Sequence, residues 1–167
     1  HPTTDAEWDA ALSRYLDSLN DAPLKRCVEV ARSHGAATLV IETRYLDIDY
    51  RSEFSAYYSR QFADVPDSAH RLHFFGKHLE SQSLWQLDAD HAYIGYVVVR
   101  PAATGLVSRA LLKPPQDLES AVRTSVTENV NFFGQQLPVR GVPFAQQDAQ
   151  LGACAHGVFP VNESNWF

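Results

Sequence analysis

Tyr93–Arg100, with the sequence YIGYVVVR, is the clearest strand signal in the chain, and Pro101 ends it. The run is apolar up to its final arginine and rich in valine and tyrosine, which is typical of a β-strand. We expect this strand to lie in the centre of a sheet. The remaining elements are interpreted around it.

Four further stretches indicate strands. Gly105–Leu112 follows closely and ends before Pro114, so we expect it to pair antiparallel with the first strand. Thr38–Leu46 (TLVIETRYL) is β-branched and aromatic, and its continuously apolar first half favours a central position. Arg71–Phe75 is a short strand candidate, and the alternating Val122–Phe133 predicts one or two strands.

Two stretches are expected to be less regular. Gln135–Pro143 is predicted to be a loop or an edge strand, because Pro138 and Pro143 bar pairing inside a sheet. Gly76–Asp90 is polar and mixed, which indicates a loop or an irregular helical turn.

Three helices are predicted. Thr4 and Glu7 have the spacing of a capping box and begin a helix over residues 5–19. A second helix runs from Pro23 to about Ser33, with Gly35 as its stop. A third helix covers residues 50–62. The expected cap of the third helix is Asp47 or Asp49. The second helix has an apolar stripe formed by Leu24, Cys27, Val28 and Ala31.

The fold class that follows is α+β, with amino-terminal helices packed on a mostly antiparallel β-sheet. We expect one domain over residues 1–167, either complete or the amino-terminal part of a larger protein. The 167 residues, 45% hydrophobic and 20% charged, suit one soluble domain with a real core.

Composition argues against several function classes. The net charge of −6 and the scattered basic residues disfavour a nucleic-acid partner. No apolar run approaches the length of a membrane helix. The sequence contains no glycine-rich phosphate loop, so no cofactor is expected. Cys27 and Cys154 make no disulfide framework, although one bridge between them stays open. Reducing cytoplasm is the expected compartment, and a removed leader stays an alternative because the chain holds no methionine.

Gly141–His156 (GVPFAQQDAQLGACAH) is the stretch in which chemistry is expected. A nucleophilic cysteine needs a lowered pKa, a base within hydrogen-bond reach and donors for the developing oxyanion. Cys154, placed two residues after Gly152, is the candidate nucleophile. Gln147 is the candidate side-chain donor, and His156 is the nearest imidazole along the chain.

The order glutamine, glycine, cysteine resembles that of papain-like cysteine peptidases, including the group that processes bacteriocins. The resemblance implies a peptide or protein partner and a hydrolase in which Cys154, Gln147 and His156 are catalytic. It covers only Gln147–His156, and the glutamine stands seven residues before the cysteine, where the family usually has six. Residues 93–101 and 135–156 together are also similar to bacterial proteins of unassigned function.

The chain also departs from the family pattern. Pro160 follows Cys154 within six residues, and no histidine lies beyond His156. A catalytic pair would then recruit an upstream histidine or one from another chain. Two alternatives stay open: Cys154 is a small buried hydrophobe, or the whole chain is a non-catalytic interaction or regulatory domain.

A metal site is not expected. The densest group of ligand-type side chains is His70, His73, His78, Asp88, Asp90 and His91. His70 and His73 have the spacing of ligands on a helix. The stretch predicts a strand, which places them on opposite faces, so ordinary surface or capping histidines are favoured.

Overall fold

The computed structural model describes residues 4–14, 21–60, 65–87, 91–101, 106–114 and 124–146. Within these ranges the chain is α+β, as predicted, with three α-helices and a six-stranded antiparallel sheet in the order β1-β2-β3-β4-β6-β5. The strands are β1 (Thr38–Tyr45), β2 (Ala69–Phe75), β3 (Tyr93–Val99), β4 (Val107–Leu112), β5 (Val126–Phe132) and β6 (Gln135–Ala145). The helices are α1 (Asp5–Leu12), α2 (Ala22–Ser33) and α3 (Ile48–Ala56), with 3-10 turns η1 (Tyr58–Arg60) and η2 (Ser83–Trp85).

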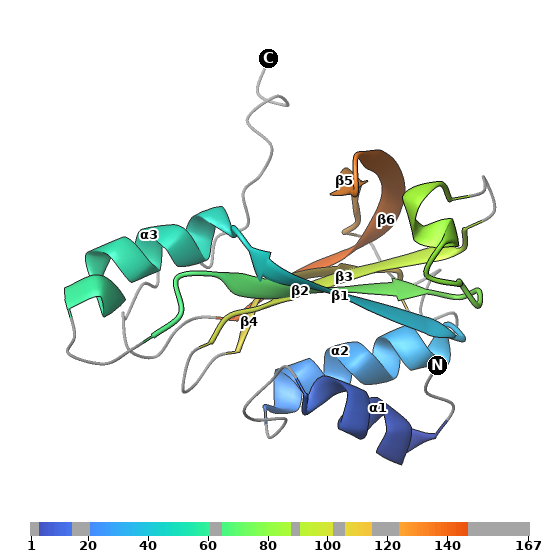
Figure 1. Cartoon of the computed structure of the whole chain (residues 1–167), viewed down its shortest axis with the longest axis horizontal. Helices are drawn as coiled ribbons and strands as arrows, with labels where there is room; N and C mark the ends of the chain where they lie inside the picture. Colours follow the sequence, from blue (N-terminus) through green and yellow to red (C-terminus); the bar gives the residue numbers. More distant parts are fainter. Residues whose placement is uncertain are drawn as a thin grey trace.

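Both faces of the sheet are covered (Figure 1). Helices α1 and α2 lie on one face, and α3 lies on the other together with the curled β5–β6 end of the sheet. Two apolar clusters fill the spaces between these layers. Trp8 and Phe74 belong to the cluster beneath α1 and α2, and Tyr96 and Phe132 belong to the opposite one.

Strand β3 is central, as expected. It pairs with β2 on one side and β4 on the other, both antiparallel, and every one of its residues is buried. Gly95 is required here, because a Cβ at this position would lie 2.1 Å from the carbonyl oxygen of Leu111. The predicted antiparallel pairing of β3 with the strand that follows it is confirmed.

Strand β1 is the edge strand beside β2 in the described sheet, so its expected central position is wrong. Leu39 and Ile41 pack against the α1–α2 cluster, and Val40 packs against the opposite cluster. The continuous apolar run therefore reflects two covered faces rather than two neighbouring strands. Beyond Glu42 the pairing with β2 becomes irregular, and Arg44 has a left-handed backbone (φ 58°).

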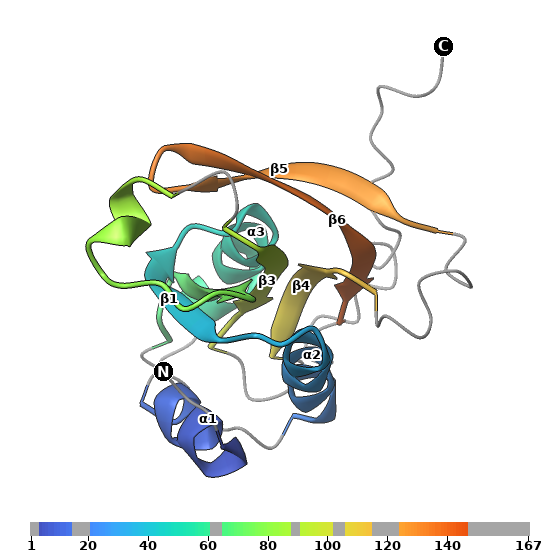
Figure 2. The ribbon, with the colours of Figure 1, turned by 90° about the vertical axis from the view of Figure 1, so that its right-hand side faces the viewer.

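Strand β6 lies inside the sheet, so the predicted loop or edge strand over Gln135–Pro143 is also wrong. Residues 135–141 pair with β5 and residues 142–145 pair with β4. Pro138 pairs only with β5, and Pro143 pairs only with β4. Each proline therefore has one strand edge without a ladder, where the missing N–H is tolerated. Figure 2 shows the resulting bend in β6.

The helix signals are largely confirmed. Thr4 and Glu7 form the predicted capping box, but α1 ends at Leu12 instead of residue 19, and residues 15–20 lie outside the described ranges. Helix α2 ends before Gly35 (φ 72°), as expected. Asp47 is the cap of α3, which begins two residues earlier than predicted and ends at residue 56. The predicted apolar stripe of α2 is buried in full: Leu24, Cys27, Val28 and Ala31.

The stretch after β2 is irregular, as predicted, and contains only η2 in its described part. No helix in the described ranges is long and apolar enough to cross a membrane.

Candidate functional site

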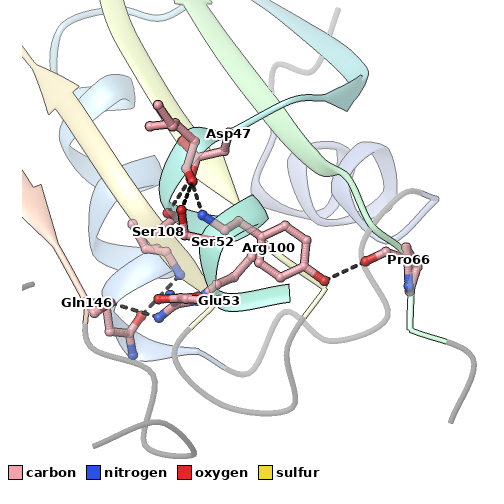
Figure 3. A network of polar contacts seen from close by, with 10 residues as sticks. Asp47, Ser52, Glu53, Pro66, Arg100, Ser108 and Gln146 are labelled. Atoms are coloured by element: carbon pink, nitrogen blue, oxygen red, sulfur yellow. Dashed lines mark hydrogen bonds and ion pairs between the residues drawn. The ribbon is translucent and has the colours of Figure 1, made fainter. Parts of the chain in front are cut away.

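The predicted catalytic residues Cys154, Gln147 and His156 lie outside the described residues. Gln146, which directly precedes Gln147, is the last residue that the structure describes. The candidate site is therefore built from the groups that hold Gln146 (Figure 3).

Gln146 is bonded through both its backbone and its side chain. Its backbone N–H donates to the carbonyl oxygen of Val107 (3.1 Å), and its own carbonyl accepts from Arg100 (2.8 Å). Its side-chain Oε1 accepts from the Val107 N–H (3.2 Å), and its Nε2 donates to Asp21 (3.2 Å). These bonds reach β4, the end of β3 and the start of α2, and they fix the point at which β6 ends.

Arg100 is the buried centre of this arrangement. It directly follows β3 and is 2% exposed. One guanidinium nitrogen donates to both carboxylate oxygens of Glu53 on α3, at 2.9 Å each, and a second donates to Gln146. A buried guanidinium needs such a counter-charge, because an unpaired charge is costly away from water.

Asp21 connects α2 to the same end of the sheet. As the cap of α2, its Oδ1 accepts from the Leu24 N–H at 2.9 Å. Its Oδ2 accepts from Gln146 and from the Leu106 N–H (3.4 Å). The start of α2, the start of β4 and the end of β6 are thus held by one carboxylate.

Asp47 is a buried carboxylate that lies beside this group (Figure 3). It is 1% exposed, and its Oδ1 accepts from the Tyr50 N–H (2.9 Å) and from the Ser108 hydroxyl (3.0 Å). Its Oδ2 has no hydrogen-bond partner among the described residues. The role of Asp47 as a helix cap, predicted from the sequence, therefore extends to joining α3 to β4.

His70 is the described histidine at this end of the sheet. It pairs in register with Val99, the residue before Arg100. From the sequence, His70 is a possible metal ligand, but an ordinary surface or capping histidine is favoured. The place of His70 in the fold depends on how β2 pairs with β3, and the sequence does not specify that pairing. The other described histidines outside β2 flank the opposite end of strands β1, β2 and β3: His34, His78 and His91.

His73 lies on the opposite face of β2 from His70, as strand geometry predicted, and it is fully buried. Its Nε2 faces a carboxylate oxygen of Glu42 at 3.4 Å, and its Nδ1 lies 2.8 Å from the Tyr93 hydroxyl. A carboxylate only accepts, so Nε2 carries the proton and the Tyr93 O–H donates to Nδ1. The neutral imidazole satisfies both contacts.

His73 and Tyr93 are neutral, and the charges beside them are those of the ion pair between Arg71 and Glu42. Burial lowers the pKa of His73, and burial raises the pKa of Tyr93 well above its usual value. Burial alone would raise the pKa of Glu42, but the contacts with His73 and Arg71 together hold it below its usual value. The group is a packed structural element, and its fully buried imidazole does not face solvent.

Two other candidates are Cys27 and the group of possible metal ligands, of which Asp88 and Asp90 lie outside the described residues. Burial, with a contribution from the charge of Asp21, raises the pKa of the Cys27 thiol to about 11. Cys27 is therefore an inert core thiol, which confirms its predicted burial. No group of three or more His, Cys, Asp or Glu side chains that could hold a metal ion occurs in the described ranges.

No family model, no curated protein and no solved structure matches this chain.

Proposed function

We propose that this domain is the scaffold of a papain-like cysteine hydrolase whose nucleophile, Cys154, follows the anchored Gln146. The observation that supports the proposal is the full set of hydrogen bonds that ties Gln146 to buried Arg100, Val107 and Asp21. A nucleophile must be held within a fraction of an ångström of its productive position. A rigidly held residue at the start of the segment that carries it, here Gln146, serves that need.

The proposed reaction is hydrolysis of a peptide bond. The Cys154 thiolate attacks the carbonyl carbon, and the amide side chain of Gln147 stabilises the oxyanion that forms. An imidazolium, which carries the proton taken from the thiol, gives it to the leaving amine as the C–N bond breaks. Water then attacks the thioester, which releases the acid and regenerates the thiol.

Two histidines are candidates for the imidazole. His156 stands two residues after Cys154, and His70 pairs with Val99 beside the strand end that holds Gln146. A histidine in contact with the sulfur would lower the thiol pKa below the free value of about 8.5. The two can be told apart by substitution.

The test is alkylation of the native chain by iodoacetamide at about pH 6, well below the free-cysteine pKa of about 8.5. Cys154 should label quickly, and Cys27 should not, because its thiol is buried with a pKa raised to about 11. His156→Ala or His70→Ala should slow the labelling of Cys154, whereas His78→Ala, at an exposed position on the opposite end, should not. Labelling of Cys154 only above about pH 8, or only after unfolding, would refute the proposal.

The expected setting and partner follow from the same chemistry. A reactive thiol persists in a reducing compartment, so we place the protein in the cytoplasm with a peptide or protein as its partner. The net charge of −6 disfavours nucleic acid as that partner.

A non-catalytic interaction domain is the second candidate function. Leu46 and Ile48 favour it, because they flank the Asp47 cap and are 66% and 74% exposed. An inert Cys154 in the alkylation test would support this alternative.

A further inference from the structure

Trp85 and Phe133 form an exposed aromatic pair at the tip of the β5–β6 hairpin. Their ring centroids are 5.0 Å apart with an interplanar angle of 39°. Trp85 is 69% exposed and Phe133 is 45% exposed. The core at this point is closed by Phe132 and Leu137 instead, so burial does not explain the pair.

The hairpin places Phe133 outward at a conformational cost. Phe133 (φ 48°) and Gly134 (φ 82°) form the two-residue turn between β5 and β6, and both are left-handed. Asparagine usually occupies the first of these positions, since a bulky side chain is strained there. Strain of this kind at an exposed turn indicates a role for the side chain beyond the fold.

Trp85 is held beside Phe133 by a clamp from another part of the chain. The Gln135 side chain accepts from the Leu87 N–H (2.7 Å) and donates to the Leu84 carbonyl (2.9 Å). These bonds fix η2 next to the hairpin turn. In Figure 2 the green helical turn lies beside the junction of β5 and β6. The two rings therefore form a preorganised surface, which reduces the entropy lost on binding.

The two segments that supply the rings carry no charge. Residues 81–87 (SQSLWQL) and 131–136 (NFFGQQ) contain no acidic or basic side chain but four glutamines and one asparagine. Gln82 stands three residues before Trp85 at the start of the 3-10 turn, a spacing that puts both side chains on one side. Gln82, Gln86 and Gln136 are exposed.

We propose that the Trp85–Phe133 surface binds a neutral carbohydrate. A pyranose ring has an apolar C–H face that can stack on an exposed indole, and hydroxyls that both donate and accept hydrogen bonds. Amide side chains match such hydroxyls because they too both donate and accept. A proline-rich peptide offers mainly carbonyl acceptors and would use only half of this capacity.

The Trp85–Phe133 surface lies at the opposite end of β6 from Gln146, the described residue on which the proposed hydrolase function rests. Gln135 begins β6 and Gln146 directly follows its other end, and the eleven residues of this strand span roughly 30 Å. Carbohydrate binding should therefore be unchanged in Cys154→Ala, and the two proposals can fail independently.

The test is a titration of the native chain with neutral tetrasaccharides of glucose, mannose and N-acetylglucosamine at millimolar concentration. The readout is the indole N–H resonance of Trp85, assigned by its loss in Trp85→Phe. At least one of the sugars should shift this resonance. The indole of Trp8, which is buried and stacked on Phe74, should stay unchanged.

Phe133→Asn is the decisive variant, since asparagine suits the left-handed turn. It should keep or raise the melting temperature while weakening sugar binding by about tenfold or more. Ile48→Ala, which removes an exposed apolar side chain elsewhere, should leave binding unchanged. The proposal is overturned if no sugar shifts the Trp85 resonance, if a proline-rich peptide shifts it instead, or if Phe133→Asn binds as the native chain does.

Discussion

Arg100 and Glu53 are joined by one guanidinium nitrogen that donates to both carboxylate oxygens, each at 2.9 Å, with Arg100 buried and Glu53 partly buried on α3. The pair fixes α3 over the sheet end, and the same guanidinium fixes β6 through Gln146. Loss of Arg100 would thus remove a charged donor from two elements at once.

Arg100→Met should destabilise the fold by about 3–5 kcal/mol, because it removes the buried counter-charge of the Glu53 carboxylate. The matched control is Arg26→Met. Arg26 pairs with Glu29 at 3.1 Å, but both side chains are exposed, so this loss should cost less than about 1 kcal/mol. Chemical denaturation would measure both, and equal losses would contradict the role assigned to Arg100.

Gly141→Ala should destabilise by about 1–3 kcal/mol or more. A Cβ at Gly141 would lie 2.3 Å from the carbonyl oxygen of Leu112, and backbone cannot move aside cheaply. At Gly76 the nearest atoms to a Cβ are at 3.5 Å, an ordinary contact, so Gly76→Ala should be close to neutral. Thermal unfolding of the two variants tests the close approach of β6 to β4.

Val98→Asp should prevent soluble expression, because Val98 is fully buried and an unpaired charge there has no compensation. Val126→Asp introduces the same change on β5 at an exposed position and should be tolerated. Soluble yield and melting temperature distinguish the two. A Val98→Asp variant that melts normally would place that side chain in water.

Stability should decline as the pH falls below about 6.5, the usual pKa of histidine. The folded-state pKa of His73 is lowered by burial, so in this window the unfolded chain binds more protons and is favoured. The lowered pKa of Glu42 extends the loss to more acidic solution. His73→Gln should flatten the decline just below about pH 6.5, and an unchanged decline would contradict the role of His73. Denaturation midpoints across this pH range provide the measurement.

The sequence predicted those elements whose signals are local. The apolar run of β3, the Thr4 capping box and the stripe around Cys27 each depend on residues within a few positions of one another. The same holds for Asp47 as the cap of α3. Local spacing was therefore sufficient for element type and for the faces of the helices.

Non-local features were not predictable in this way. Pro138 and Pro143 argued against an interior strand, but the two ladders of β6 occupy different halves of it, and that division is set by β4 and β5. Glu53, which balances Arg100, comes from another element, 47 residues away. One signal was missed: a phenylalanine followed by Gly134 between two strand patterns has the spacing of a two-residue hairpin turn.

The candidate site was predicted only in part. The stretch from Gly141 onward was singled out for its chemistry, and the structure shows that its described beginning is the end of a strand followed by an anchored glutamine. The roles of Cys154, Gln147 and His156 stay predictions, because these residues lie outside the described ranges. The placement of His70 beside the strand end that leads to Arg100 needed the register of β2 and β3.

The two ladders of β6 have a consequence for folding. The β5–β6 hairpin is closed by a two-residue turn, and its described ladder to the rest of the sheet involves only residues 142–145. The hairpin ladder joins residues that are close along the chain. It can therefore form early during folding, before the strands that are distant in sequence pair with one another. Native-state hydrogen exchange should then reveal it as a separate cooperative unit, with opening free energies that differ from those of β2 and β3.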